Sequence, residues 1–234
     1  MDADSSRRVP IETPRVALGI PSVDALLGGG LETDAVTEFY GEGGSGKTVA
    51  CLQVATRLAA AGTWVAYIDT EGVSVDRLDA ISGGQLPQVL GHLLLSTPHS
   101  MTEQTRAVHS ACALAKRGSR RVGLIVVDSV TFYYRLSIGQ EEDDSGRTEL
   151  AQQLAELVGT ALSSGVPVVV TNQVWRNLKD GVLEPLGGSY VNHVAKTILR
   201  FERLDGGRRR VVLVKHRALP PGSAEFQITA TGTR

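Results

Sequence analysis

A glycine-rich stretch near the start of the chain constrains its fold more than any other feature. Its residues, Gly41-Glu42-Gly43-Gly44-Ser45-Gly46-Lys47-Thr48, fit the pattern G-x-x-x-x-G-K-[ST] at every fixed position. A strand pattern over 36–40 precedes it, and a helical pattern over 47–61 follows. Glycines let successive backbone N–H groups point at one anion, and the start of a helix adds partial positive charge. The stretch therefore predicts a phosphate-binding loop between a strand and a helix.

The residues around this loop predict a site for ATP with Mg²⁺. We expect Lys47 to contact the β- and γ-phosphates and the Thr48 hydroxyl to bind the metal. A second acidic anchor is expected at the end of a neighbouring strand, and Asp128 closes the apolar run 124–127. An aspartate at a strand end is also a common turn cap, but its pairing with the loop favours the metal role.

Two further residues are candidates for acting on the γ-phosphate. Glu71 follows the apolar run 64–69 and is placed to orient a water or accept its proton. The alternative is an acidic residue that favours the start of the next helix. Gln173 follows the run 166–171 and is a candidate to hydrogen-bond the γ-phosphate and report its presence to the next segment. The alternative is a polar strand-end residue.

Strand and helix patterns alternate along most of the chain. Continuous apolar runs at 124–128 and 166–171 are typical of central parallel strands that are covered on both faces. Such alternation predicts an α/β fold with right-handed crossovers and a mainly parallel sheet. The expected strands are 36–40, 64–69, 93–95, 124–128, 166–171 and 224–229, and the expected helices are 47–61, 101–117 and 149–162.

In the last third of the chain the alternation of strands and helices ends. Residues 197–204 and 208–216 flank Asp205-Gly206-Gly207, which predicts a β-hairpin. We found no internal repeat, and we expect one domain over residues 16–234 after a flexible tail of residues 1–15.

Composition excludes several classes of protein. Of the 234 residues 42% are hydrophobic, yet no apolar run approaches the length of a membrane span. The polar residues 1–15 lack the apolar core of a secretory signal, and Cys51 and Cys112 stand far apart, so we expect a cytoplasmic protein without disulfides.

The net charge of −1 argues against a protein that coats nucleic acid by charge alone. Residues 171–217, however, hold ten Lys or Arg against four Asp or Glu. This segment is either a localised polyanion-binding face or a hairpin edge protected by positive side chains.

The motifs together resemble the RecA-type recombinase superfamily and, within it, the short archaeal paralogues of the main recombinase. The resemblance covers almost the whole chain from residue 16. Besides the glycine-rich loop, it is carried by Gly19-Ile20-Pro21-Ser22-Val23-Asp24-Ala25-Leu26-Leu27-Gly28-Gly29-Gly30, Tyr67-Ile68-Asp69-Thr70-Glu71-Gly72, residues 124–129, Val170-Thr171-Asn172-Gln173-Val174 and Leu186-Gly187-Gly188.

This resemblance implies a RecA-like P-loop ATPase core with helices on both faces of the sheet and a C-terminal β-hairpin. It assigns Glu71 as the water-orienting glutamate and Asp128 as the second metal anchor. Arg77 resembles the arginine that stacks on adenine, although its spacing from the glutamate is one residue shorter here.

The resemblance also implies two segments that bind single-stranded DNA, here residues 135–147 and 174–191. The first contains Glu141-Glu142-Asp143-Asp144, which repels phosphates and is read as a solvated loop. The second offers stacking surfaces and cations together, in Trp175, Arg176, Lys179 and Tyr190. Local packing is the alternative for the two aromatic residues.

Lys215 and Arg217 lie at the end of the predicted hairpin, as Lys215-His216-Arg217. In several RecA-like ATPases a Lys-x-Arg there reaches the γ-phosphate of a neighbouring subunit, which implies a homo-oligomer and hydrolysis that needs assembly. The alternative is a basic pair on an exposed strand.

Three functions remain open. The resemblance favours an ATP-binding, weakly hydrolysing, DNA-binding protein of DNA repair and homologous recombination that regulates the main recombinase, with that recombinase or other repair proteins as partners. The alternatives are a filament-forming strand-exchange recombinase and a KaiC-like regulatory ATPase. The chain is expected to be too short for the N-terminal helix-hairpin-helix domain of the archaeal recombinases, which argues against strand exchange in long filaments.

Overall fold

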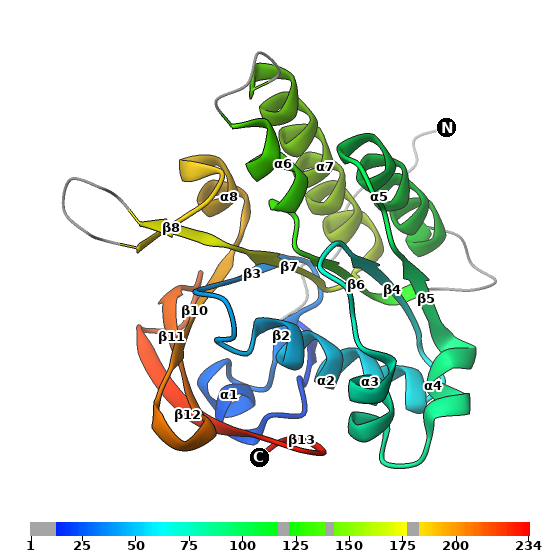
Figure 1. Ribbon diagram of the computed structural model, residues 1–234, viewed down its shortest axis with the longest axis vertical. Helices are drawn as coiled ribbons and strands as arrows, with labels where there is room; N and C mark the ends of the chain where they lie inside the picture. The colour runs from blue at the N-terminus through cyan, green and yellow to red at the C-terminus, as the bar shows by residue number, and fades with distance from the viewer. Residues whose placement is uncertain (1–12, 117–121, 139–142, 177–182) are drawn as a thin grey trace, which may run out of the picture.

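A computed structural model describes residues 13–116, 122–138, 143–176 and 183–234 (Figure 1). Within these ranges the chain builds one large sheet with the strand order β13-β12-β11-β10-β3-β7-β6-β4-β5. Its strands are β3 (Val36–Tyr40), β4 (Trp64–Asp69), β5 (Leu93–Ser96), β6 (Val122–Asp128), β7 (Val168–Asn172), β10 (Thr197–Arg203), β11 (Arg208–Lys215), β12 (Gly222–Thr229) and β13 (Gly232–Thr233).

The sheet has a parallel half and an antiparallel half. All pairings from β10 through β3, β7, β6 and β4 to β5 are parallel, whereas β10, β11, β12 and β13 pair antiparallel. The short 3-10 helix η1 (Asp205–Gly207) joins β10 to β11, where the sequence predicted a hairpin turn. The predicted fold, a mainly parallel α/β sheet with a C-terminal hairpin, is confirmed.

Helices cover both faces of this sheet, as Figure 1 shows. One face carries α1 (Pro21–Leu26), α2 (Lys47–Ala60), α3 (Val75–Ser82) and α4 (Leu86–His92), and the other carries α5 (Met101–Lys116), α6 (Phe132–Ser137), α7 (Asp143–Ser164) and α8 (Gly188–Val194). None of the helices in the described part of the chain is long and apolar enough to cross a membrane.

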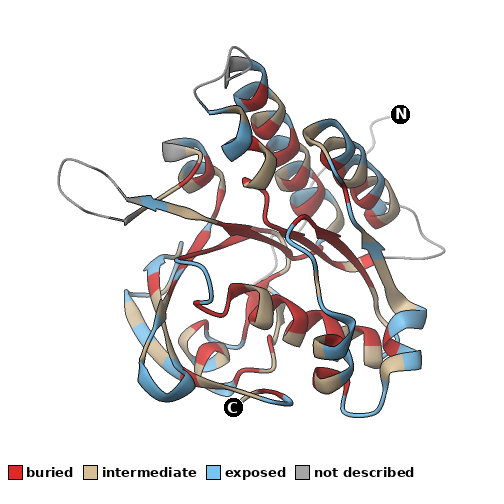
Figure 2. Ribbon diagram, viewed as in Figure 1, coloured by how far each residue is buried: buried red, intermediate tan, exposed pale blue. Residues whose placement is uncertain are grey.

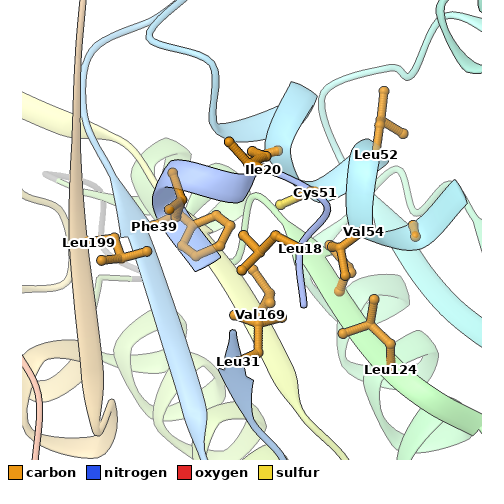
Figure 3. Close-up of a cluster of buried hydrophobic side chains, with 14 of the residues drawn as sticks. Leu18, Ile20, Leu31, Phe39, Cys51, Leu52, Val54, Leu124, Val169 and Leu199 are labelled. Atoms are coloured by element: carbon orange, nitrogen blue, oxygen red, sulfur yellow. The ribbon is translucent and has the colours of Figure 1, made fainter. Parts of the chain in front are cut away.

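Successive residues of the central strands are buried in two different apolar cores, one on each face of the sheet. On β4, Val65 and Tyr67 face the core under α2, whereas Ala66 and Ile68 face the core under α5 and α7. The same alternation on β6 leaves both of its faces buried, so its sequence reads as a continuous apolar run. Figure 2 shows these strands buried along most of their length, and Figure 3 shows part of the core under α2.

The start of α7 differs from the prediction. The helix begins at Asp143, six residues before the expected start at Glu149. The added residues are polar or glycine, so no apolar periodicity marks this part of the helix. The acidic run 141–144, for which the sequence predicts a solvated loop, therefore ends inside a helix, while Glu141 and Glu142 lie outside the described residues.

Two small antiparallel pairs lie beside the main sheet. β1 (Arg15–Val16) pairs with β2 (Leu31–Glu32), so the expected boundary between tail and domain, after residue 15, falls inside a strand. Residues 1–12 of the expected tail lie outside the described residues. β8 (Val174–Arg176) pairs with β9 (Leu183–Pro185) to form an arm that extends beyond the sheet (Figure 1).

Candidate nucleotide-binding site

The glycine-rich loop runs from the end of β3 to the first residue of α2, as the sequence predicts. A Cβ at Gly41 would lie 2.2 Å from the carbonyl oxygen of Phe201 on β10. Gly46 has a φ of +103°, and a Cβ there would lie 3.0 Å from Ile228. Larger residues are therefore excluded at these two positions by the close approach of neighbouring strands and by the left-handed backbone.

Lys47, the first residue of α2, lies 7% exposed inside this loop. Its ammonium donates hydrogen bonds to the carbonyl oxygens of Gly41 (2.8 Å) and Glu42 (3.1 Å). Burial lowers the pKa of Lys47, and the carboxylates of Glu71 and Asp128 oppose that shift. The loop therefore presents a cation that is held between backbone oxygens and two nearby acids.

Asp128 ends β6 and is buried next to Thr48. Its carboxylate accepts hydrogen bonds from the Thr171 hydroxyl (2.5 Å) and the Tyr67 hydroxyl (2.9 Å). Burial raises the pKa of Asp128, and hydrogen bonds from Thr171, Tyr67 and Thr48 oppose that rise. The two residues that the sequence assigns to a metal thus lie next to each other. A hydroxyl and a carboxylate suit Mg²⁺, which takes few protein ligands when it also binds phosphates.

Glu71 lies beyond the end of β4, where Asp69 shapes the turn. The carboxylate of Asp69 accepts hydrogen bonds from the backbone N–H groups of Glu71 (3.1 Å), Gly72 (2.9 Å) and Val73 (2.6 Å). An aspartate that binds the backbone in this way fixes the path of the loop. Asp69 is therefore a positioning residue that the sequence reasoning did not single out.

Glu71 and Gln173 are in direct contact. The Gln173 side-chain amide donates to Glu71 Oε1 at 2.6 Å, and its own oxygen accepts a hydrogen bond from Arg135 at 2.8 Å. Gln173 also leads into the β8–β9 arm, because its carbonyl oxygen accepts from the backbone N–H of Leu186 (2.9 Å). The structure thus brings together the two residues expected at the γ-phosphate and connects them to the arm.

The phosphate loop, Glu71 and Gln173 line one cavity of about 470 Å³, whereas Asp128 is buried behind Thr48 and is not among the described residues of its wall. The predicted members of its wall are Gly41, Gly43, Gly44, Gly46, Lys47, Thr48, Glu71 and Gln173. Sequence reasoning did not place Val49, Arg135, Val174, Arg209 and Ile228 there. Arg209 and Ile228 come from the C-terminal strands, and only the parallel pairing of β10 with β3 brings them to the loop. No sequence signal identifies them.

Arg77 lies elsewhere. Its guanidinium donates to the carbonyl oxygens of Thr229 (2.8 Å), Ala230 (2.7 Å) and Gly232 (3.4 Å), at the turn between β12 and β13. It is not among the described residues that line the cavity. In this structure Arg77 holds the end of the chain, and its expected stacking on adenine stays a prediction.

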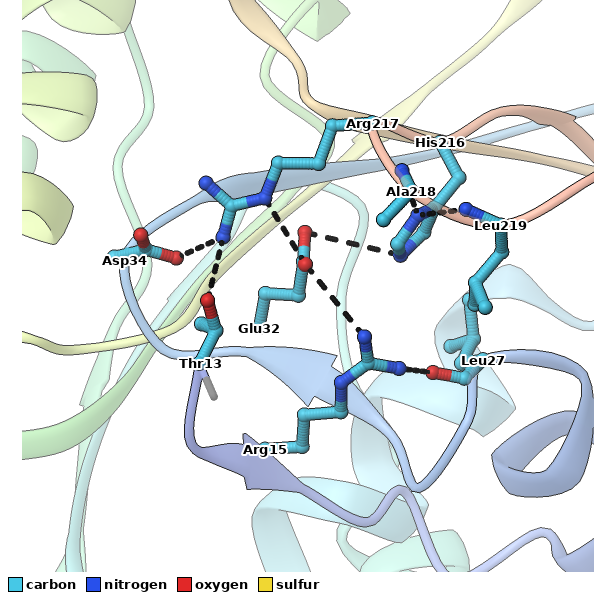
Figure 4. Close-up of polar contacts among 9 residues, drawn as sticks. All are labelled: Thr13, Arg15, Leu27, Glu32, Asp34, His216, Arg217, Ala218 and Leu219. Atoms are coloured by element: carbon cyan, nitrogen blue, oxygen red, sulfur yellow. Dashed lines mark hydrogen bonds and ion pairs between the residues drawn. The ribbon is translucent and has the colours of Figure 1, made fainter. Parts of the chain in front are cut away.

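Lys215 and Arg217 are also bound within their own chain. The Lys215 ammonium donates to the carbonyl oxygens of Asn192 (2.7 Å) and Ala195 (2.8 Å), at the end of α8. The Arg217 guanidinium donates to Glu32 (3.0 Å), Asp34 and Thr13, as Figure 4 shows. Neither residue lines the cavity of its own chain in the described structure. Action on a neighbouring subunit would require Arg217 to leave both carboxylates.

The residues expected at DNA lie near the arm and α8. Trp175 on β8 is 47% exposed and Tyr190 on α8 is 41% exposed, so both present aromatic surface. The Tyr190 hydroxyl donates to the carbonyl oxygen of Ala151 (3.3 Å). Arg176 ends β8, and Lys179 lies outside the described residues.

Comparison with known proteins finds relatives along almost the whole chain. The family model described as Rad51 matches residues 11–234. A relative from Methanococcoides burtonii, named DNA repair and recombination protein RadB, is 42% identical over 91% of this chain and 94% of its own length. A relative of the same name from Methanoculleus marisnigri is 39% identical over 96% of this chain and 99% of its own length. Another, from Thermoplasma acidophilum, is 38% identical over 93% of each chain.

The match extends over the loop, the strand-end acids, the arm and the C-terminal strands alike. It confirms the resemblance that the motifs carry, and the chain belongs to the Rad51 family of RecA-type proteins.

Proposed function

We propose that this protein binds ATP with Mg²⁺, hydrolyses it weakly, and binds single-stranded DNA as a mediator or regulator of the main recombinase in DNA repair. One observation carries the proposal: the loop lysine, the Thr48–Asp128 pair and the Glu71–Gln173 pair converge at the phosphate loop, next to the base of the arm. The names of the relatives supply the biological setting.

The loop residues are suited to hold the nucleotide. Backbone N–H groups at the start of α2 and the Lys47 ammonium offer donors and positive charge to a triphosphate. Lys47 would exchange the carbonyls of Gly41 and Glu42 for phosphate oxygens, which accept stronger, charge-assisted hydrogen bonds. Thr48 and Asp128 would hold Mg²⁺, which when bound neutralises phosphate charge.

Glu71 would act on the attacking water. Its carboxylate lies in the wall of the same cavity as the loop, with one oxygen held by Gln173, so it is placed to orient a water and accept its proton. Lys47 would stabilise negative charge that develops on the transferred phosphoryl group. Lys215 and Arg217 are engaged within the chain, so neither of them completes this site, which supports slow turnover.

Gln173 would connect the nucleotide to DNA. Its side chain binds Glu71, and its backbone binds Leu186 next to β9. A phosphate that competes for the Gln173 amide would break the contact with Glu71 and change the position of the arm that carries Trp175. The arm would then bind single-stranded DNA by stacking and by the charges of Arg176 and Lys179.

The test is a set of measurements on the full chain with ATP and single-stranded DNA. The proposal predicts ATP-dependent DNA binding and slow hydrolysis, without strand-exchange product and without long filaments by electron microscopy. Filaments with exchange product would establish a recombinase instead. Rings without affinity for DNA would establish a regulatory ATPase of the KaiC kind.

A further inference from the structure

An arginine from the C-terminal hairpin lies in the wall of the nucleotide cavity. Arg209 is on β11, where it pairs with Arg203 of β10 and Phe226 of β12. Alternate residues of a strand share a face, and the next members of this face, Val211 and Leu213, are buried in the core under α2. Arg209 therefore lies on the face of the sheet that α2 covers. It is at the end of β11 that borders the cavity.

The stem of Arg209 packs against the phosphate loop. A Cβ on Gly46 would lie 3.5 Å from Cγ of Arg209 and 3.5 Å from the ring of Phe226. Gly46 directly precedes Lys47, so Arg209 lines the cavity near the lysine that is expected to bind phosphate. Two cations from distant parts of the sequence thus share one small space.

The charge of Arg209 has no acidic partner among the described residues. One guanidinium nitrogen donates to the carbonyl oxygen of Arg208 (2.8 Å), and its buried Nε has no hydrogen-bond partner in the described structure. Burial and the nearby charge of Arg203 both lower the pKa of Arg209. By contrast, Arg208 and Arg210 on the opposite face of β11 form ion pairs with Glu225 (3.5 and 3.1 Å).

A buried donor without a partner is costly, and so is a partly buried charge without a counterion. An anion in the cavity would remove both costs, and a guanidinium offers phosphate several N–H donors in a fixed planar fork. We propose that Arg209 binds the phosphates of the nucleotide within its own subunit, as a second cation beside Lys47. This inference rests on the proposed function, because it requires a nucleotide at the loop.

The position of Arg209 favours phosphate over DNA as its ligand. It lies in a cavity of about 470 Å³ whose other walls include the phosphate loop, Glu71 and Gln173. The exposed, acid-paired Arg208 and Arg210 belong to the outer surface instead. Arg209 is also supplied in cis, so its contribution does not depend on a second copy of the chain.

Isothermal titration of the full chain without DNA tests the inference, with two probes: MgATP and inorganic tripolyphosphate. Tripolyphosphate has no base or ribose, so it reports on phosphate contacts alone. In Arg209→Gln we expect the affinity for both probes to fall roughly tenfold or more, as for loss of a charge-assisted hydrogen bond. Arg208→Gln removes the same charge from the outer face of the same strand and should bind both probes like the wild type.

The outcomes separate this inference from the proposed function. If Lys47→Ala abolishes binding of MgATP while Arg209→Gln binds both probes normally, the nucleotide site stands and the role of Arg209 is wrong. A loss for MgATP but not for tripolyphosphate places Arg209 at the base or ribose and also overturns the inference. If the wild type binds neither probe, both proposals fail. Should Arg209→Gln unfold, Arg209→Met retains the stem against Gly46 and must show the same loss.

Discussion

The side-chain amide of Gln173 lies 2.6 Å from a carboxylate oxygen of Glu71, although 102 residues separate them in the sequence. One of these residues is placed to act on water, and the other leads into an arm with an exposed tryptophan. The contact links the chemistry expected at the cavity to the surface expected to meet DNA, and it can be broken at either end.

Removal of the Glu71 carboxylate should separate ATP binding from ATP hydrolysis. Glu71→Gln retains a side chain that can hydrogen-bond Gln173 but cannot accept a proton, so ATP affinity should change little while turnover falls about 100-fold or more. Single-turnover hydrolysis and nucleotide titration measure the two quantities separately. An unchanged rate would exclude Glu71 as the group that acts on water.

Removal of the Gln173 side-chain amide should uncouple the nucleotide cavity from the DNA-binding arm. In Gln173→Ala, ATP should still bind, but its effect on DNA affinity should be lost, because the side chain that joins the cavity to the arm is gone. Fluorescence anisotropy of labelled single-stranded DNA, with and without MgATP, measures this coupling. A variant that retains the full effect of ATP would show that the signal takes another route.

The arm itself should bind DNA by stacking and charge. Trp175→Ala should weaken binding by about 1–3 kcal/mol, and the double variant Arg176→Ala with Lys179→Ala should flatten the dependence of affinity on salt. The His99→Ala variant changes an exposed residue before α5 and serves as the control. A salt dependence equal to that of the wild type would place the DNA contacts on another basic surface.

Arg217 should contribute to stability. Glu32 is 3% exposed, and Arg217→Ala removes a hydrogen bond to its carboxylate at 3.0 Å as well as the contact with Asp34. We expect the free energy of unfolding to fall by about 2 kcal/mol in urea titrations. Arg200→Ala breaks a more exposed pair with Glu202 and should cost less than about 1 kcal/mol.

The same variant tests the alternative role of Arg217 in a neighbouring subunit. That role predicts an ATPase rate per subunit that rises with protein concentration, and a loss of this rise in Arg217→Ala at unchanged stability. A structural role predicts the reverse: Arg217→Ala is less stable, and its ATPase rate per subunit depends on protein concentration as that of the wild type does.

Stability should depend on pH through Glu38, which is fully buried on β3 and accepts a hydrogen bond from Asn172 (2.8 Å). Burial raises the pKa of Glu38 from 4.5 to about 7, and the bond from Asn172 and the charge of Lys215 oppose that rise. Between these values the folded protein holds a proton that the unfolded chain releases, so stability falls as pH rises toward 7.

Glu38→Gln removes this titration. Relative to the variant, the wild type should lose about 2 kcal/mol of unfolding free energy between roughly pH 5 and pH 8, which urea titrations at the two values measure. Glu225→Gln, at an exposed carboxylate, should leave the pH dependence of the wild type intact. If the unfolding free energies of the wild type and Glu38→Gln changed with pH in parallel, Glu38 would not titrate in this range.

Much of the fold could be predicted because each central strand carries its own signal. A continuous apolar run is typical of a strand that is buried on both faces, so the runs ending at Asp69, Asp128 and Asn172 identify the central strands and the edge at which their polar ends meet. That edge, together with the glycine-rich loop, is sufficient to bring the predicted site residues to one place. They are Lys47, Thr48, Glu71, Asp128 and Gln173.

The remainder depends on contacts between distant segments. Whether a basic residue meets phosphate, a carboxylate or a carbonyl is decided by what lies opposite it: Arg77 meets the carbonyls of residues 229–232, Arg217 meets Glu32, and Arg209 meets the phosphate loop. Nothing in the sequence around these arginines distinguishes the three surroundings. Short elements such as β1 and α4 hold too few residues for a periodicity to stand out.

The most direct measurement is a crystal structure of the protein with MgCl₂ and a non-hydrolysable ATP analogue. The account predicts a triphosphate inside the loop of residues 41–48, with Lys47 turned from the backbone carbonyls to phosphate and the metal beside Thr48 and Asp128. A loop that holds no nucleotide at saturating concentration, or a nucleotide bound at another cavity, would contradict it.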